Sequence, residues 1–267
     1  MAEVISVINQ KGGVGKTTTA VNLAYFLAKA GKEVLLIDFD PQGNASSGLG
    51  LEKKGLTRTM TDVMMRKAEI SDVVVATRCK GLIVAPAKPD LANAEVVMAG
   101  MNKKFIHLRD EVKKIEQTFD YVLIDCPPSL SLLTVNAMIA SDWLLLPVQT
   151  EFYALEGVSQ LLESMKLVKK VMNPELKLLG VLPTMHDKRT ALSGQVLVEV
   201  KKYFKDKVFE TLIPRNVRLA EAPSHGVAIG QYDKFSKGAR AYEKLTKEVI
   251  KRIEGDPKKV VAKKGKK

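Results

Sequence analysis

The sequence predicts a single α/β domain built on a mostly parallel, twisted sheet with helices on both faces. Short apolar runs alternate with longer amphipathic stretches along the chain, which is typical of buried parallel strands joined by covering helices. The 267 residues, 46% hydrophobic and 27% charged, are enough to bury a sizeable core. Neither internal repeats nor a long linker interrupt the pattern. We therefore expect one domain at 1–254 and a separate tail at 255–267.

The predicted elements follow from the length and periodicity of the apolar runs. The strands are the short runs, in chain order Val4–Ile8, Val34–Ile37, Leu82–Val84, Tyr121–Ile124, Trp143–Pro147 and Leu178–Leu182, with Lys207–Thr211 as a weaker candidate. The helices are the longer stretches with a three-to-four-residue period, at Thr17–Ala30, Leu91–Met98, Lys104–Gln117, Leu132–Ile139, Tyr153–Val171, Ser193–Phe204 and Gly238–Ile253. No run approaches the roughly 18 apolar residues of a membrane span, so we expect a cytoplasmic protein.

A glycine-rich loop follows the first predicted strand and leads directly into the first predicted helix. Its sequence is Lys11-Gly12-Gly13-Val14-Gly15-Lys16-Thr17-Thr18. Glycines let the backbone approach a ligand with several N–H groups pointing inward, and the helix start adds its positive dipole end. In such a loop Lys16 reaches the β and γ phosphates and Thr17 places its hydroxyl on Mg2+. The loop therefore predicts a nucleoside triphosphate site.

The loop is a variant of the general pattern G-x-x-x-x-G-K-[ST], because Gln10 stands where that pattern asks for glycine. The variant adds a second lysine, Lys11, five residues before Lys16. Two lysines of one loop crowding one nucleotide would repel each other, so Lys11 is better placed to reach a nucleotide held by another subunit. This predicts an ATP-dependent homodimer. From the residues alone, the alternative is a glycine-rich turn with solvated lysines.

Three aspartates come at the ends of predicted strands, where ligands bind in open α/β sheets. Asp38 and Asp40 close the second strand, and Asp125 closes the run that begins at Tyr121. We expect Asp125 to hold the Mg2+ shell as a Walker B carboxylate. For Asp38 and Asp40, the alternative is that they only cap the turn before Pro41.

Several motifs together resemble one family. The glycine loop resembles the deviant Walker A motif of the ParA/MinD group of P-loop ATPases. The segment Asp38-Phe39-Asp40-Pro41-Gln42-Gly43-Asn44 resembles the second signature of the ParA (Soj-type) chromosome-partitioning ATPases. The similarity continues through Asp125-Cys126-Pro127-Pro128-Ser129 and Leu219-Ala220-Glu221-Ala222-Pro223-Ser224-His225-Gly226, so it covers residues 2 to about 250.

The resemblance implies a P-loop ATPase that uses ATP and Mg2+ and is stimulated by a partner. We expect a slow intrinsic rate because no arginine finger is apparent in the sequence. The resemblance implies that Lys11 and Lys16 neutralise phosphate charge and that Asp40 orients or activates the attacking water. It also implies that Asp38 supports either the loop or the magnesium shell that Thr17 and Asp125 form. It places adenine beside Thr184-Met185 and Pro214-Arg215-Asn216-Val217, although simple packing at the core edge explains these residues equally well. The predicted nucleotide contacts are then residues 11–18 with Met185, Pro214 and Asn216.

The two cysteines, Cys79 and Cys126, are too few for a disulfide scaffold or a zinc site within one chain. A related ATPase, the nitrogenase iron protein, bridges an iron–sulfur cluster between subunits with two cysteines from each chain. Neither cysteine of this chain stands in the Cys-Gly-Gly context of that family. We therefore expect two ordinary thiols.

The chain is basic, with a formal net charge of +12. Residues 251–267 contain eight lysine or arginine residues and two acidic ones. With proline, glycine and few apolar residues, 255–267 reads as a disordered basic arm. Such an arm is consistent either with phosphate binding by counterion release or with a solubilising role alone.

A second group of basic residues lies in the C-terminal third, at Lys188, Arg189, Lys201, Lys202, Lys205, Lys207, Arg215 and Arg218. The resemblance to ParA implies that Arg189 and Arg218 lie on a surface that binds double-stranded DNA without sequence preference. We extend this prediction to Lys188, Lys201 and Lys202. The chain has neither a helix-turn-helix nor a zinc motif for sequence-specific binding. Solvated helix faces are the alternative for these lysines.

Three functions use the same ATP cycle. The first is a partitioning ATPase that binds the nucleoid and a ParB-like, centromere-binding partner. The second is a MinD-like, membrane-associated regulator of division-site placement. A membrane-binding tail would need a bulky apolar face, whereas Val260-Val261-Ala262 stand among lysines. The third positions another cargo. The motifs quoted above favour the first, and we expect no stable membrane association.

Overall fold

The computed structural model describes residues 1–152 and 154–255, and its sheet has seven strands. Their order across the sheet is β3-β4-β2-β5-β1-β6-β7. The strands are β1 (Glu3–Val7), β2 (Val34–Asp38), β3 (Val75–Ala76), β4 (Leu82–Ala85), β5 (Tyr121–Asp125), β6 (Trp143–Gln149) and β7 (Lys177–Thr184). All neighbouring pairs are parallel except β3 with β4. The predicted fold class is confirmed.

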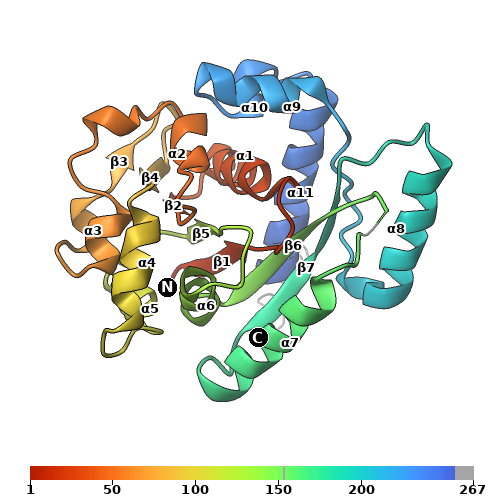
Figure 1. The fold of residues 1–267 in the computed structure, drawn as a ribbon. Helices are drawn as coiled ribbons and strands as arrows, with labels where there is room; N and C mark the ends of the chain where they lie inside the picture. Colours follow the sequence, from red (N-terminus) through yellow and green to blue (C-terminus); the bar gives the residue numbers. More distant parts are fainter. Residues whose placement is uncertain (153, 256–267) are drawn as a thin grey trace, which may run out of the picture.

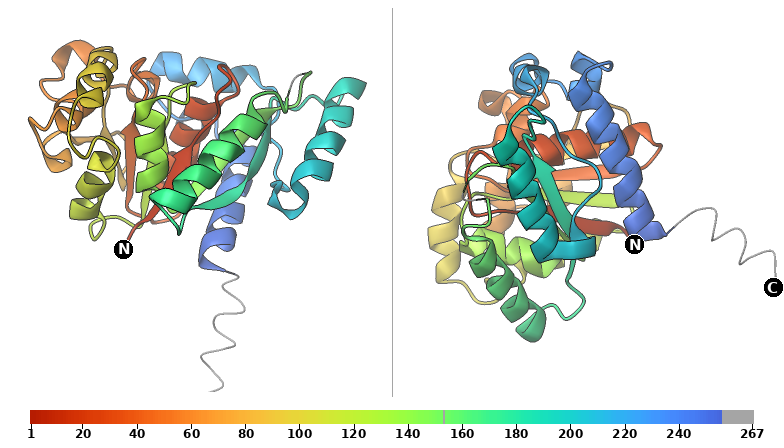
Figure 2. Two further views of the ribbon diagram at one scale, coloured as in Figure 1. Left: turned by 60° about the horizontal axis from the view of Figure 1, so that its bottom comes forward. Right: turned by 90° about the vertical axis from the view of Figure 1, so that its right-hand side faces the viewer.

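Eleven α-helices surround this sheet among the described residues (Figure 1). They are α1 (Lys16–Lys29), α2 (Asn44–Gly48), α3 (Met60–Met64), α4 (Leu91–Ala99), α5 (His107–Ile115), α6 (Leu132–Ala140), α7 (Val158–Val171), α8 (Ala191–Phe204), α9 (Val217–Glu221), α10 (Ile229–Tyr232) and α11 (Lys237–Glu254). Helices α1 and α11 lie side by side on one face, and α4, α5 and α6 lie on the other (Figures 1 and 2).

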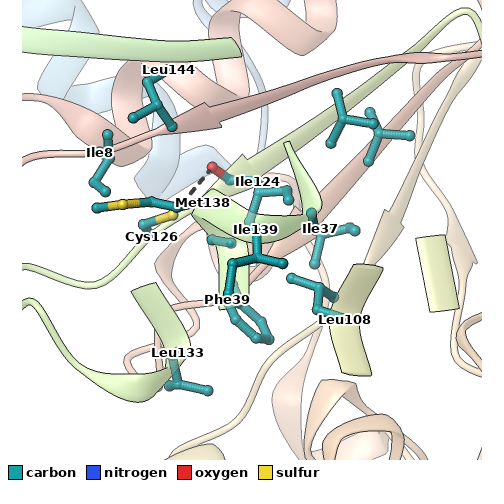
Figure 3. Packing of buried hydrophobic residues seen from close by; sticks show 14 of the residues in the cluster. Ile8, Ile37, Phe39, Leu108, Ile124, Cys126, Leu133, Met138, Ile139 and Leu144 are labelled. Carbon is teal, nitrogen blue, oxygen red and sulfur yellow. Dashed lines mark hydrogen bonds between the residues drawn. The ribbon is translucent and has the colours of Figure 1, made fainter. Parts of the chain in front are cut away.

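The strands are buried on both faces, so their residues divide between two cores. In β2, Leu35 and Ile37 pack with the helices of the α4–α6 side, while Val34 and Leu36 pack with α1 and α11. Figure 3 shows the first core, where Phe39 lies close to Leu108 and Ile139. A parallel sheet covered on both sides needs continuous apolar runs rather than alternation, which is why these strands were predictable.

Two predicted elements are wrong in part because backbone turns interrupt their apolar pattern. Helix α7 begins at Val158 and not at the predicted Tyr153, since Gly157 takes a left-handed conformation with φ 74° at its start. Helix α5 begins at His107 and not at Lys104, after Lys103 takes φ 58°.

The weak strand candidate Lys207–Thr211 is not a strand. Residues 205–207 form a 3-10 turn, and the segment after it makes one isolated bridge, Val208 with Val181. Val208 and Phe209 are buried against the two cores, so their apolar character serves packing rather than strand pairing. The edge strand β3 has only two residues and was not predicted.

The predicted tail at 255–267 lies outside the described residues beyond Gly255. Among the described residues, no helix is long and apolar enough to cross a membrane. The two cysteines are free and buried.

Candidate nucleotide and magnesium site

The glycine-rich loop lies at the carboxyl end of β1, between β5 and β6 in the sheet. The chain leaves β1 for β2 on one side and later returns to build β6 on the other side, so the loop stands at the point where the strand order reverses. This is where open parallel sheets bind ligands. Asn9 anchors the start of the loop, because its amide donates to Pro147 O (2.7 Å) and accepts from Lys11 N (3.0 Å).

The loop backbone is shaped for close approach by a ligand. Gly13 and Gly15 have φ angles of 73° and 90°, which disfavour any residue with a side chain. A Cβ atom built on Gly12 or Gly13 would have no neighbour within 4 Å, so the space above the loop is open. Helix α1 starts directly after Gly15, and no side chain caps its first N–H groups, which have no partner within the helix. The loop therefore fits a phosphate chain.

Lys16 is the buried cation of the site, with 6% of its surface exposed. Its ammonium donates to Lys11 O at 3.0 Å. Burial lowers the pKa of Lys16, and the charges of Asp125 and Asp40 oppose this shift. The side chain is thus held close to carboxylates at the end of the loop, where it can neutralise a bound phosphate.

Asp38 and Asp125 are adjacent in the register of β2 and β5, and both are fully buried. Neither oxygen of Asp125 forms a hydrogen bond within the described chain, although the nearby Thr17 hydroxyl partly offsets the rise in its pKa. That pKa is raised mainly by burial and next by the charge of Asp38. Buried carboxylates without partners are high in energy, and a divalent cation would supply the missing positive charge. Thr17, Asp38 and Asp125 therefore fit an Mg2+ ion.

Ser46 of α2 clamps Asp38. The Ser46 hydroxyl and backbone N–H both donate to Asp38 Oδ2, at 2.6 and 2.7 Å, and the same hydroxyl accepts from Ala87 N at 3.2 Å. Asp40 lies just beyond the strand, is 6% exposed, and accepts from Gln42 N at 2.9 Å. Asp38 is thus fixed within the site, whereas Asp40 belongs to the loop that follows it.

The pKa of Asp38 gives a first prediction. Burial raises it to about 6 against the hydrogen bonds from Ser46, so folded Asp38 keeps a proton that the unfolded chain releases near pH 4. Without metal and nucleotide, its contribution to the free energy of unfolding should therefore fall as the pH rises from about 4 to 6, by at most about 3 kcal/mol. Above about pH 6, Asp38 is ionised in both the folded and the unfolded chain, so its contribution to the free energy of unfolding no longer changes with pH.

Asp38→Asn removes this titration, so its melting temperature relative to the wild type should rise between pH 4 and pH 7. Thermal unfolding in the presence of a chelator measures the difference. A variant whose relative stability stays flat or declines over that interval contradicts the prediction.

A cavity of about 330 Å3 opens beside the loop. One side is formed by the end of β7 and the other by the segment 213–217, and Tyr242 of α11 and Gly15 close it. The predicted base contacts Met185, Pro214 and Asn216 all line this cavity. Asn216 Oδ1 is buried in the described chain without a hydrogen-bond partner, so an acceptor is available to a bound amino group. Thr184 joins the cavity to the loop by donating to Val14 O at 2.8 Å.

Asn9, Ser46 and Thr184 hold the site, and the sequence did not assign them these roles. Their bonds connect segments between 8 and 170 residues apart. No fixed separation in the sequence links such a hydroxyl or amide to the group that it bonds, so its role cannot be predicted from spacing. Asn9 could have been suspected because it ends the apolar run of β1.

The predicted DNA residues are placed on separate surface elements, with Lys188 and Arg189 before α8, Lys201 and Lys202 on α8, and Arg218 on α9. The two arginines are ion-paired. Arg189 makes a two-pronged pair with Asp187 at 2.9 and 2.7 Å, and Arg218 contacts Glu221 at 2.9 Å. The hydrogen bonds from Arg189 lower the pKa of Asp187.

The fold and the loop define the class: this is a P-loop nucleoside triphosphatase. A family model described as an AAA domain matches residues 2–178. The sporulation initiation inhibitor protein Soj of Bacillus subtilis is 53% identical over 249 residues, which are 93% of this chain and 98% of that protein. The chromosome partitioning protein ParA of Myxococcus xanthus is 48% identical over 252 residues, or 94% of this chain and 89% of that protein. The chain therefore belongs to the ParA/Soj family of chromosome-partitioning ATPases.

Solved structures agree on the fold. A crystal structure of cobyrinic acid a,c-diamide synthase from Mycobacterium smegmatis with bound ADP and magnesium has a TM-score of 0.84 at 36% identity, covering 95% of this chain and 96% of that one. The cell division ATPase MinD of Pyrococcus furiosus has a TM-score of 0.75 at 28% identity, covering 94% and 99%. Nucleotide and magnesium binding is thus a property of the family.

Proposed function

We propose that this partitioning ATPase forms a sandwich dimer around ATP, that the dimer binds nucleoid DNA without sequence preference, and that a ParB-like partner stimulates hydrolysis and releases it. The observation that carries the proposal is the glycine loop, in which Lys11 stands beside a complete single-chain phosphate site. Sequence identity of 53% to Soj supports the partitioning role. The protein would then be cytoplasmic and associated with the nucleoid.

In this proposal, residues 11–18 hold the phosphates and Lys16 neutralises their charge. Thr17, Asp38 and Asp125 would hold Mg2+, which when bound supplies a Lewis acid for phosphoryl transfer. Asp40 orients the attacking water from the loop after β2. Adenine occupies the cavity lined by Met185, Pro214 and Asn216, with Asn216 Oδ1 accepting from its amino group.

Lys11 is the proposed link between subunits. Its side chain is only partly buried, and within the described part of the chain its ammonium makes neither a hydrogen bond nor an ion pair. Lys11 contributes its backbone carbonyl to the site, where it accepts a hydrogen bond from the Lys16 ammonium. The phosphate site of one chain is therefore complete without the Lys11 side chain. A free cation at the mouth of the site suits the phosphates of a second copy.

Lys11→Ala should bind ATP within about threefold of the wild type and fail to dimerise, since it loses only the contact across the interface. Analytical ultracentrifugation with Mg2+–ATP, in an Asp40→Asn background to prevent hydrolysis, measures the dimer. Lys54→Ala serves as the control and should dimerise normally, because Lys54 is exposed and its ammonium bonds no other residue that the structure describes. Normal dimerisation of Lys11→Ala would rule out the role across subunits.

The proposed DNA surface rests on exposed cations. The Arg189 and Arg218 side chains are 86% and 51% exposed in their ion pairs. Exposed pairs stabilise a protein little, so a phosphate can replace the carboxylate partner. Lys188, Lys201 and Lys202 are also exposed, and they add positive charge before and along α8.

Binding to DNA should need ATP and fall steeply as salt rises, because counterion release drives it. Arg189→Ala and Arg218→Ala should each weaken binding uniformly across DNA sequences and reduce the salt slope by about one. Co-sedimentation with plasmid DNA and, separately, with anionic liposomes, in ATP and in ADP, tests the proposal. Arg58→Ala removes an exposed arginine that also pairs with a carboxylate, and it should change nothing. ATP-dependent liposome binding that survives high salt, without DNA binding, would instead support the MinD-like function.

A further inference from the structure

Three buried polar side chains meet next to Met185, a residue that lines the base cavity. Thr150 lies just after β6, His186 just after β7, and Ser193 in the first turn of α8, and their exposed fractions are 2%, 9% and 3%. Ser193 Oγ lies 2.7 Å from Thr150 Oγ1 and 2.9 Å from His186 Nδ1. The Ser193 hydroxyl can donate to one of these neighbours and accept from the other. The cluster ties two strand ends to one helix.

The backbone of His186 joins the two sides of the cavity. Its N–H donates to Ile213 O at 2.9 Å, and its carbonyl accepts from Arg215 N at 3.2 Å. These bonds hold the segment that contains Pro214 and Asn216 against the end of β7. A shift of His186 would therefore move both sides of the cavity together.

The residue before His186 is under backbone strain. Met185 has φ 50°, a left-handed conformation that a residue with a long side chain rarely adopts. Strained residues persist only where their surroundings fix them, and they gather at ligand sites. Met185 is fixed on one side by the Thr184 bond to the glycine loop and on the other by His186 in the polar cluster.

We propose that His186, supported by Ser193 and Thr150, is a positioning residue that holds Met185 in its strained conformation and so keeps the adenine cavity formed before the nucleotide binds. The inference rests on the proposed base site. A buried polar cluster costs desolvation that apolar side chains would not, and in return it fixes one geometry. A preformed cavity raises affinity because the nucleotide does not have to order it.

His186 is the better position for the test. Ser193 also accepts from Asp187 N at 3.2 Å, so its loss would disturb the loop that carries Arg189 as well. His186→Leu removes the ring nitrogen that bonds Ser193. His186→Asn restores a polar atom at about the place of Nδ1, and its amide can donate or accept as required.

The experiment compares two ligands that share the phosphate site. Isothermal titration calorimetry measures the binding of Mg2+–ATP and of magnesium tripolyphosphate, which has no base. We expect His186→Leu to weaken ATP binding by about tenfold and to leave tripolyphosphate binding within about twofold, because only the base side is lost. His186→Asn should recover most of the ATP affinity. In turnover assays, KM for ATP should rise in His186→Leu while kcat stays near the wild-type value.

Two controls keep the outcome clear. Ser141 is a buried serine whose hydroxyl bonds Ser6 and Ala137 O. It stands before the amino end of β6, whereas Thr150 follows the carboxyl end of the same strand, so Ser141→Ala should lose stability without losing ATP affinity. If His186→Leu does not fold, Ser193→Ala replaces it. The expected result is the same, with weaker ATP binding and tripolyphosphate binding close to that of the wild type. Unchanged ATP binding, or an equal loss for both ligands, would overturn the inference. Failure of the wild type to bind ATP would instead overturn the proposed function.

Discussion

Lys16→Ala is expected to lose ATP binding by about 100-fold or more. The Lys16 ammonium is buried beside Asp125 and Asp40. A water molecule that replaced it would carry no positive charge. Hydrogen bonds to charged groups contribute about 1.5–3 kcal/mol each, and this lysine can make more than one to a triphosphate. Removing it also leaves the neighbouring carboxylates facing the phosphates without compensation.

Calorimetric titration with Mg2+–ATP measures the loss directly. Lys29→Ala is the matched control, since Lys29 is exposed and stands at the opposite end of the same helix. The control should bind ATP as the wild type does. A Lys16→Ala protein that is folded by circular dichroism and binds ATP within tenfold of the wild type would show that the loop is not the phosphate site.

The phosphate side of the site could be predicted because it is local in sequence. One strand, its glycine loop and the following helix carry Lys16 and Thr17, and Asp38 and Asp125 each end a strand. Parallel pairing then brings Asp38 and Asp125 into register without further information. The apolar runs of the strands were equally readable, because both faces of the sheet are covered.

The base side could not be derived in the same way. Its cavity combines the end of β7 with residues near 215, about 30 positions later, and only the family resemblance connected them. The cluster of Thr150, His186 and Ser193 has no spacing rule, since it depends on the mutual placement of β6, β7 and α8. The same is true of the Ser46 clamp on Asp38.

Asp40→Asn should stop hydrolysis while keeping nucleotide binding. Asparagine retains an acceptor for Gln42 N, so the loop after β2 should stay in place and only the carboxylate charge is lost. Groups that orient or deprotonate an attacking nucleophile contribute about 100-fold or more to the rate. ATP binding should stay the same or become tighter, because a negative charge near the triphosphate is removed.

Turnover at saturating Mg2+–ATP and calorimetric affinity, measured on one preparation, separate the two effects. Asp90→Asn makes the same chemical change at an exposed carboxylate that accepts from Thr61, away from the glycine loop, and should hydrolyse ATP at the wild-type rate. In sedimentation, Asp40→Asn with ATP should accumulate the proposed dimer, which hydrolysis should make short-lived in the wild type. Wild-type turnover in Asp40→Asn would move the role of orienting water to another residue. A matched loss of affinity and rate would instead mean that Asp40 supports the binding site as a whole, since only a selective loss of rate identifies a group that acts on the reacting water.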